Sequence, residues 1–73
     1  MSVDQIDLGR AEGSFEAVLT ADAGNALAAF NLAVVRAESG DPAGARLLFS
    51  RVQELAPGST LAGRAAIAVS VTP

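Results

Sequence analysis

Apolar residues recur at steps of three and four along most of the chain, which is the spacing of one face of an α-helix. Residues 42–56 show the pattern most clearly, and residues 7–22 show it again. The stripe of the later stretch consists of Ala45, Leu48, Phe49, Val52 and Leu55. Neither stretch has the strict alternation of a half-buried β-strand. The pattern therefore predicts amphipathic helices.

Clusters of glycine, proline and asparagine divide the chain into four segments of helical length. These segments are residues 7–22, 26–39, 42–56 and 60–71. N-cap residues precede the second, third and fourth segments: Asn25, Asp41 and Ser59. Gly40 suits the left-handed residue that closes a helix, and we expect Gly44 and Gly63 to mark places where helices pack closely. The prediction is an all-α fold of about four antiparallel helices joined by short turns.

The chain has 73 residues, which suffices for a single domain over residues 1–73. A core of this size rarely leaves more than about 3–5 kcal/mol of net stability. The chain contains neither cysteine nor histidine, which excludes disulfides and the usual zinc and haem ligands. Helix packing and self-association remain as the sources of stability.

Charge and hydropathy narrow the class of protein further. The net charge is −3 and the five basic residues, all arginine, are scattered, whereas a nucleic-acid surface needs clustered cations. We interpret these arginines, Arg64 excepted, as ordinary solvated charges. No stretch reaches the roughly 20 apolar residues of a membrane span, and the first residues lack the features of a signal peptide. We expect a cytoplasmic protein, and the absence of lysine beside abundant alanine, glycine and arginine indicates a bacterial source.

The sequence offers little for catalysis. Without histidine, cysteine, lysine or tyrosine, only carboxylates and hydroxyls remain as acid, base or nucleophile. Glu12 and Glu16 share one helical face, but no further ligand stands near them, so we interpret them as a solvated acidic face. The sequence predicts a non-enzymatic protein with no catalytic residue, no cofactor and no metal site.

An internal repeat becomes visible when the sequence is aligned with itself at an offset of 34 positions. Identical residues then coincide at 7 and 41, 11 and 45, 15 and 49, 18 and 52, 24 and 58, 27 and 61, 28 and 62, and 35 and 69. The matches fall on turn residues and on the apolar stripe. We therefore expect Phe15 and Phe49 to have equivalent buried environments.

A helix–turn–helix repeat of 34 residues is the period of the tetratricopeptide repeat, and the chain resembles that family. Leu32-Ala33, Gly40-Asp41, Ala45-x₃-Phe49 and Pro57 fall in register with its motif. The departures are Ala29 at the aromatic position, Arg36 at the tyrosine position, Val52 at the late small position and Ala23 at the earlier proline position. The resemblance implies one full repeat, 26–59, flanked by half repeats 7–25 and 60–71. A four-helix unit with coincidental periodicity, or a related helical-pair repeat, is the alternative.

The resemblance also implies a concave groove, lined by segments 26–39 and 60–71, that binds another protein or a peptide segment. The groove-facing positions would be Leu27, Phe30, Asn31, Val34, Leu61, Arg64 and Ala68. Phe30 would be either an exposed anchor for a partner or part of the core. Asn31 and Arg64 match fragments of a carboxylate clamp that some family members possess. The implied function is that of an adaptor or assembly factor.

The segment 60–71 is apolar on all sides, although the last helix of a repeat array normally has a polar outer face. We therefore expect self-association through Ile67, Val69 and Val71, and we favour a symmetric homodimer over a head-to-tail array. Two alternatives to an adaptor remain open. The first is a purely structural homo-oligomer, and the second is an excised fragment of a longer repeat protein.

Overall fold

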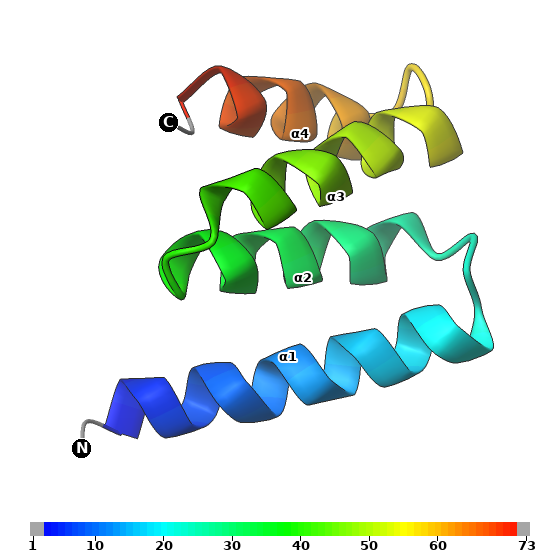
Figure 1. Cartoon of the computed structure of the whole chain (residues 1–73). Coiled ribbons are helices and arrows are strands. Elements are labelled where there is room, and N and C mark those ends of the chain that lie inside the picture. Colours follow the sequence, from blue (N-terminus) through cyan, green and yellow to red (C-terminus); the bar gives the residue numbers. More distant parts are fainter. Residues whose placement is uncertain (1–2, 72–73) are drawn as a thin grey trace.

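The computed structural model describes residues 3–71, and their side chains from residue 9 onward. It contains four helices, and Figure 1 shows them stacked in chain order. Their bounds are α1 Val3–Ala21, α2 Ala26–Glu38, α3 Pro42–Leu55 and α4 Thr60–Val71. The predicted all-α fold is confirmed, and no strand occurs within residues 3–71. The predicted boundaries agree within one residue except at the start of α1, which begins at Val3 instead of residue 7.

The predicted caps form the expected hydrogen bonds. Backbone amides donate to the capping side chains over 2.9 Å from Ala28 to Asn25, 3.0 Å from Gly44 to Asp41 and 3.0 Å from Ala62 to Ser59. Gly40, which follows the end of α2, has a φ of +88°, a conformation that other residues adopt only with strain. Local sequence therefore determines where the last three helices begin and where α2 ends.

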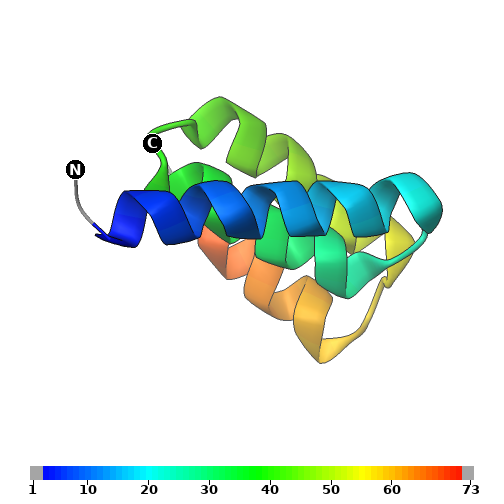
Figure 2. The ribbon, with the colours of Figure 1, turned by 90° about the horizontal axis from the view of Figure 1, so that it is seen from below.

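The two ends of the stack differ in how many neighbours they have. Among the described residues, α1 packs against α2 alone, whereas α4 at the other end packs against both α3 and α2. The view from below shows α1 running across the near face with the other helices behind it (Figure 2). Helices α1 and α4 consequently lie at opposite ends of the stack (Figure 1).

The core is centred on the α2–α3 contact and is built mostly from small side chains. Its buried cluster consists of Ala29, Ala33, Ala45, Phe49, Val52 and Ala65. Alanine at so many contact positions lets the helix backbones approach closely, and Phe49 supplies most of the remaining volume. Of the side chains that the structure describes, only those of α2, α3 and α4 belong to this cluster, so the described part of α1 is attached to the core and does not form part of it.

The expectation that Phe15 and Phe49 share equivalent buried environments is wrong. Phe49 is 2% exposed, whereas Phe15 is only partly buried. The same difference separates Val52, which is buried, from Val18, which is 41% exposed. The reason is position: α3 lies between α2 and α4, whereas α1 has a single neighbour among the described helices.

The two glycines expected at close helix crossings have different surroundings. A Cβ added at Gly44 would lie 2.8 Å from Cγ of Asp41, so the close approach is to the capping side chain of the same helix and not to a crossing helix. A Cβ added at Gly63 would have nothing within 4 Å. The close-packing expectation is therefore wrong for Gly63, because no described helix covers that side of α4.

Candidate functional site

Phe30 joins α2 to both α3 and α4. Its ring meets Phe49 edge-on, with 5.4 Å between the ring centroids and 70° between the ring planes. The guanidinium carbon of Arg64 lies 5.6 Å from the centroid of the same ring, within the range of a cation–π contact. Phe30 is partly buried. It therefore combines the two alternatives left by the sequence, because the ring contacts Phe49 of the core and also has an exposed arginine over it.

Other predicted groove residues lie beside Phe30. Val34, Leu61 and Ala68 are partly buried and pack against the core cluster. Helices α2 and α4, which carry them, are in contact with each other. We call Phe30, Val34, Leu61, Arg64 and Ala68 the α2–α4 strip. The strip is apolar, and Arg64 provides its charge.

Leu27 and Asn31 belong to a different surface. They line a shallow depression of about 180 Å³ between α1 and α2. Its lining residues are Phe15, Val18, Asn25, Leu27, Ala28 and Asn31, and we call it the α1–α2 depression. Asn31 thus faces α1 while Arg64 lies over Phe30. The structure divides the predicted groove residues between two surfaces and gives the two residues of the expected clamp different neighbours.

Arg36 is the centre of an ion-pair cluster that the sequence did not reveal. One of its guanidinium nitrogens lies 2.9 Å from Glu16 and 3.5 Å from Glu12, and the other lies 3.3 Å from Asp41. These side chains keep between 31% and 48% of their surface exposed to solvent, but they are paired with one another, which the interpretation as ordinary solvated charges did not include. Arg36 links α1 and α2 to the residue that caps α3. The sequence did contain one signal for this cluster, because Arg36 stands where the tetratricopeptide motif has tyrosine.

The residues expected to drive self-association are not equally accessible. Ile67 is 67% exposed and Val71 is also exposed, whereas Val69 is partly buried against the core. The open face of α4 is therefore carried by Ile67 and Val71, with Val69 at its edge.

Two kinds of site have no support in the described part of the chain. No group of three or more acidic, histidine or cysteine side chains there is arranged to hold a metal ion. No described helix is both long enough and apolar enough to cross a membrane. The described residues instead form apolar surfaces at helix–helix junctions, one of them with an arginine over an aromatic ring.

A stack of antiparallel helices with capped short turns and a partly open strip along alternate helices defines a helical-repeat protein. The comparison with protein families agrees: the tetratricopeptide repeat model matches residues 3–68. The chain therefore belongs to the tetratricopeptide repeat family. Members of this family are generally non-enzymatic and mediate protein–protein interactions. Comparisons with curated proteins and with solved structures give no match.

Proposed function

We propose that the chain is a non-enzymatic adaptor or assembly factor that binds a segment of a partner protein along the α2–α4 strip. The proposed organisation is a single domain with one full repeat, 26–59, between the half repeats 7–25 and 60–71. The observation that carries the proposal is the stack of Arg64 on Phe30, which joins α2 and α4 at a partly open apolar surface.

The chemistry of the strip indicates the kind of segment that it accepts. Phe30, Val34 and Leu61 offer partly buried apolar surface, and an aromatic ring beside an arginine is typical of residues that contribute most to binding. Arg64 is exposed, and an arginine guanidinium pairs well with a carboxylate. A segment with a bulky apolar side chain next to an acidic residue matches both features. Leu27 and Asn31 would border such a segment on the side of α1.

A second proposed function is self-association, with a homodimer as the smallest assembly, through Ile67, Val69 and Val71. The exposure of Ile67 and Val71 at the end of the stack supports it. Apolar area buried there contributes about 25 cal/mol per Å² before the entropic cost of association is subtracted. A purely structural homo-oligomer would bind only to itself and to no other protein.

The test of adaptor function is capture of partners on immobilised protein. Arg64→Glu reverses the charge of the strip at an exposed position, and Arg51→Glu makes the same change at an exposed position of α3, outside the strip. We expect proteins from a bacterial extract that bind saturably to wild type and to Arg51→Glu to be lost with Arg64→Glu. Equal capture by both variants would contradict binding at the strip.

Phe30→Ala tests whether the ring contributes to binding beyond its share in the core. Because the ring is partly buried, we expect a loss of about 1–3 kcal/mol in the free energy of unfolding, below the 3–5 kcal/mol of a fully buried Phe. The captured proteins should be lost under conditions where circular dichroism still reports a folded variant. A folded Phe30→Ala variant with undiminished capture would show that the Phe30 ring does not contribute to binding.

A further inference from the structure

The same face is covered on α2 and open on α4, although the two helices are equivalent at the 34-residue offset. On α2, Ala29 and Ala33 are completely buried in one cluster with Phe49 of α3. Their equivalents on α4 are Gly63 and Ile67, both exposed. The face of α4 that lies open is therefore the face that α3 covers on α2.

The complementary face is open at the other end of the stack. Helix α1 is equivalent to α3 at the same offset, but Phe15 and Val18 are more exposed than Phe49 and Val52. On the neighbouring helix, Leu27 is 58% exposed, whereas its equivalent Leu61 is partly buried against the core. In the middle of the molecule, α2 covers the equivalent surface of α3, and its Phe30 ring contacts Phe49. No described helix occupies the corresponding place beside α1.

We propose that a second copy of this chain supplies the missing helix at each end, so that α4 of one copy packs on α1 of the next as α2 packs on α3. The two helices together complete one repeat across the junction. This inference rests on the proposed self-association and names its two surfaces. The repeat equivalence favours this heterologous contact over the symmetric pairing of two α4 helices.

The side chains of the two open faces are compatible with such a contact. Leu32-Ala33 on α2 corresponds to Ala66-Ile67 on α4, so a large and a small side chain exchange places while the combined volume changes little. Arg64 occupies the place of Phe30. By the same equivalence, Arg64 would meet Phe15 of the second copy as Phe30 meets Phe49, with a cation–π contact in place of the ring–ring contact.

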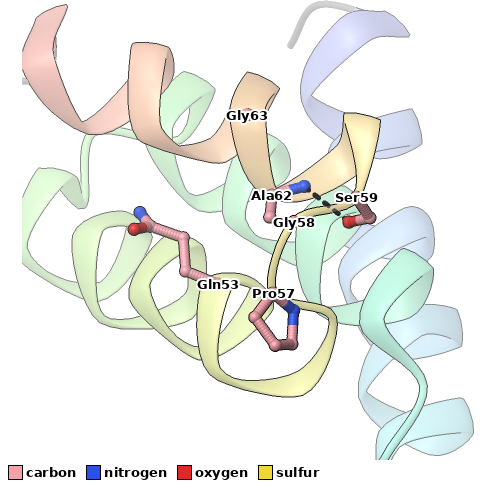
Figure 3. A pocket seen from close by; sticks show the side chains of 6 residues that line it. All are labelled: Gln53, Pro57, Gly58, Ser59, Ala62 and Gly63. Carbon is pink, nitrogen blue, oxygen red and sulfur yellow. Dashed lines mark hydrogen bonds between the residues drawn. The ribbon is translucent and has the colours of Figure 1, made fainter.

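A hollow lies at each of the two surfaces proposed for the contact. A hollow of about 470 Å³ lies beside the start of α4, and Figure 3 shows the residues that line it. It is lined by Gln53, Pro57, Gly58, Ser59, Ala62 and Gly63. Ala29, the equivalent of Gly63, is completely buried in the core cluster with Val52 near the end of α3, so the hollow would receive the end of α1 from the second copy. The α1–α2 depression would receive α4 at the opposite end.

The test combines two variants, each with one blocked surface. Val18→Glu blocks the α1 side and Ile67→Glu blocks the α4 side, and both positions are at least 41% exposed in the single chain. A glutamate buried there without a partner is unfavourable, so each variant alone should self-associate at least about tenfold more weakly than wild type. Mixed together, they should form a one-to-one heterodimer, because each retains the surface that the other lacks. Both variants carry the same added charge, so electrostatic attraction would not explain the heterodimer.

Sedimentation velocity over a concentration series gives the readout, and circular dichroism checks the fold. The matched control is Leu47→Glu, at an exposed leucine of α3 outside both surfaces, which should associate as wild type does. Val18→Glu that still dimerises alone would overturn the head-to-tail contact and leave self-association intact. Folded single variants that stay monomeric even when mixed would overturn the pairing of α1 with α4. A wild-type chain that stays monomeric at all concentrations would overturn self-association itself.

Discussion

The contact between α1 and α2 and the contact between α3 and α4 are equivalent at the 34-residue offset, yet they are built differently. The α3–α4 contact has Phe49, Val52 and Ala65 buried in one cluster. The α1–α2 contact has the equivalent Phe15 and Val18 only partly covered, with Leu27 open beside them. Nearly the same residues thus yield a closed core in one place and a shallow depression in the other. The difference lies in the helices around each contact, since a repeat buries its apolar face only when both neighbours are present.

The α1–α2 contact has a polar component that its counterpart lacks. Arg36 bridges Glu12 and Glu16 of α1 to Asp41, whereas the residue equivalent to Arg36 is Ser70. The arginine side chain is 31% exposed, so each pair contributes modestly, on the order of 0.2–1 kcal/mol. The ion pairs supplement the limited apolar burial of α1 and orient it on α2.

The largest expected effect is a loss of stability on truncating one of the two equivalent phenylalanines. Phe49→Ala should lower the free energy of unfolding by about 3–5 kcal/mol, because the lost side chain leaves a cavity in the core. Phe15→Ala should cost less than half as much, because solvent already reaches that ring. Urea denaturation of both variants, monitored by circular dichroism, measures the difference. Equal losses would mean that α1 is as firmly packed as α3.

An intermediate effect is expected from Arg36→Met, which keeps much of the apolar stem and removes the charge. We expect a loss of about 1 kcal/mol at low ionic strength, because three carboxylates lose their shared partner. The loss should shrink at roughly 1 M salt, where the Debye length is about 3 Å. Arg51→Met, at an exposed arginine of α3, is the control and should change stability little. A salt-independent loss of stability equal to that of the control would mean that the ion pairs do not stabilise the packing of α1.

The smallest effects concern two glycines within helices. Gly44→Ala should destabilise by about 1 kcal/mol, because the added methyl group displaces the Asp41 carboxylate that caps α3 and pairs with Arg36. Gly13→Ala on α1, where an added Cβ meets nothing within 4 Å, should stabilise by about 0.5–1 kcal/mol through helix propensity. Thermal unfolding curves of the two variants show whether each substitution stabilises or destabilises the protein. A stabilising Gly44→Ala would show that the cap is dispensable.

The helix caps could be predicted from the sequence, whereas the burial of each position in the repeat could not. Asn25, Asp41 and Ser59 cap helices through neighbours a few residues away, so their roles are visible in a short window. The burial of Phe15 depends on whether a helix lies on its far side, which the residue pattern does not contain. Gly63 illustrates the same point, because its equivalent Ala29 is buried only through the helix that follows it.

The sequence did not predict how the structure divides the expected groove residues. Phe30, Val34 and Leu61 pack against the core cluster, whereas Leu27 and Asn31 line the α1–α2 depression. A rotation of 100° per residue separates Phe30 from Asn31 on the helix, and sequence alone does not say which neighbour each direction meets. The Arg36 cluster was missed because its partners lie up to 24 positions away in the sequence.

Hydrogen exchange measured by mass spectrometry tests the central claim, that α1 and α4 each leave one apolar face open at the ends of the stack, most directly. At low micromolar concentration, the amides of α1 should be less protected than those of α2 and α3, because an end helix with one neighbour opens more readily. Near millimolar concentration, protection of α1 and α4 should rise together while α2 and α3 change little. Uniform protection along the chain, unchanged by concentration, would contradict the account.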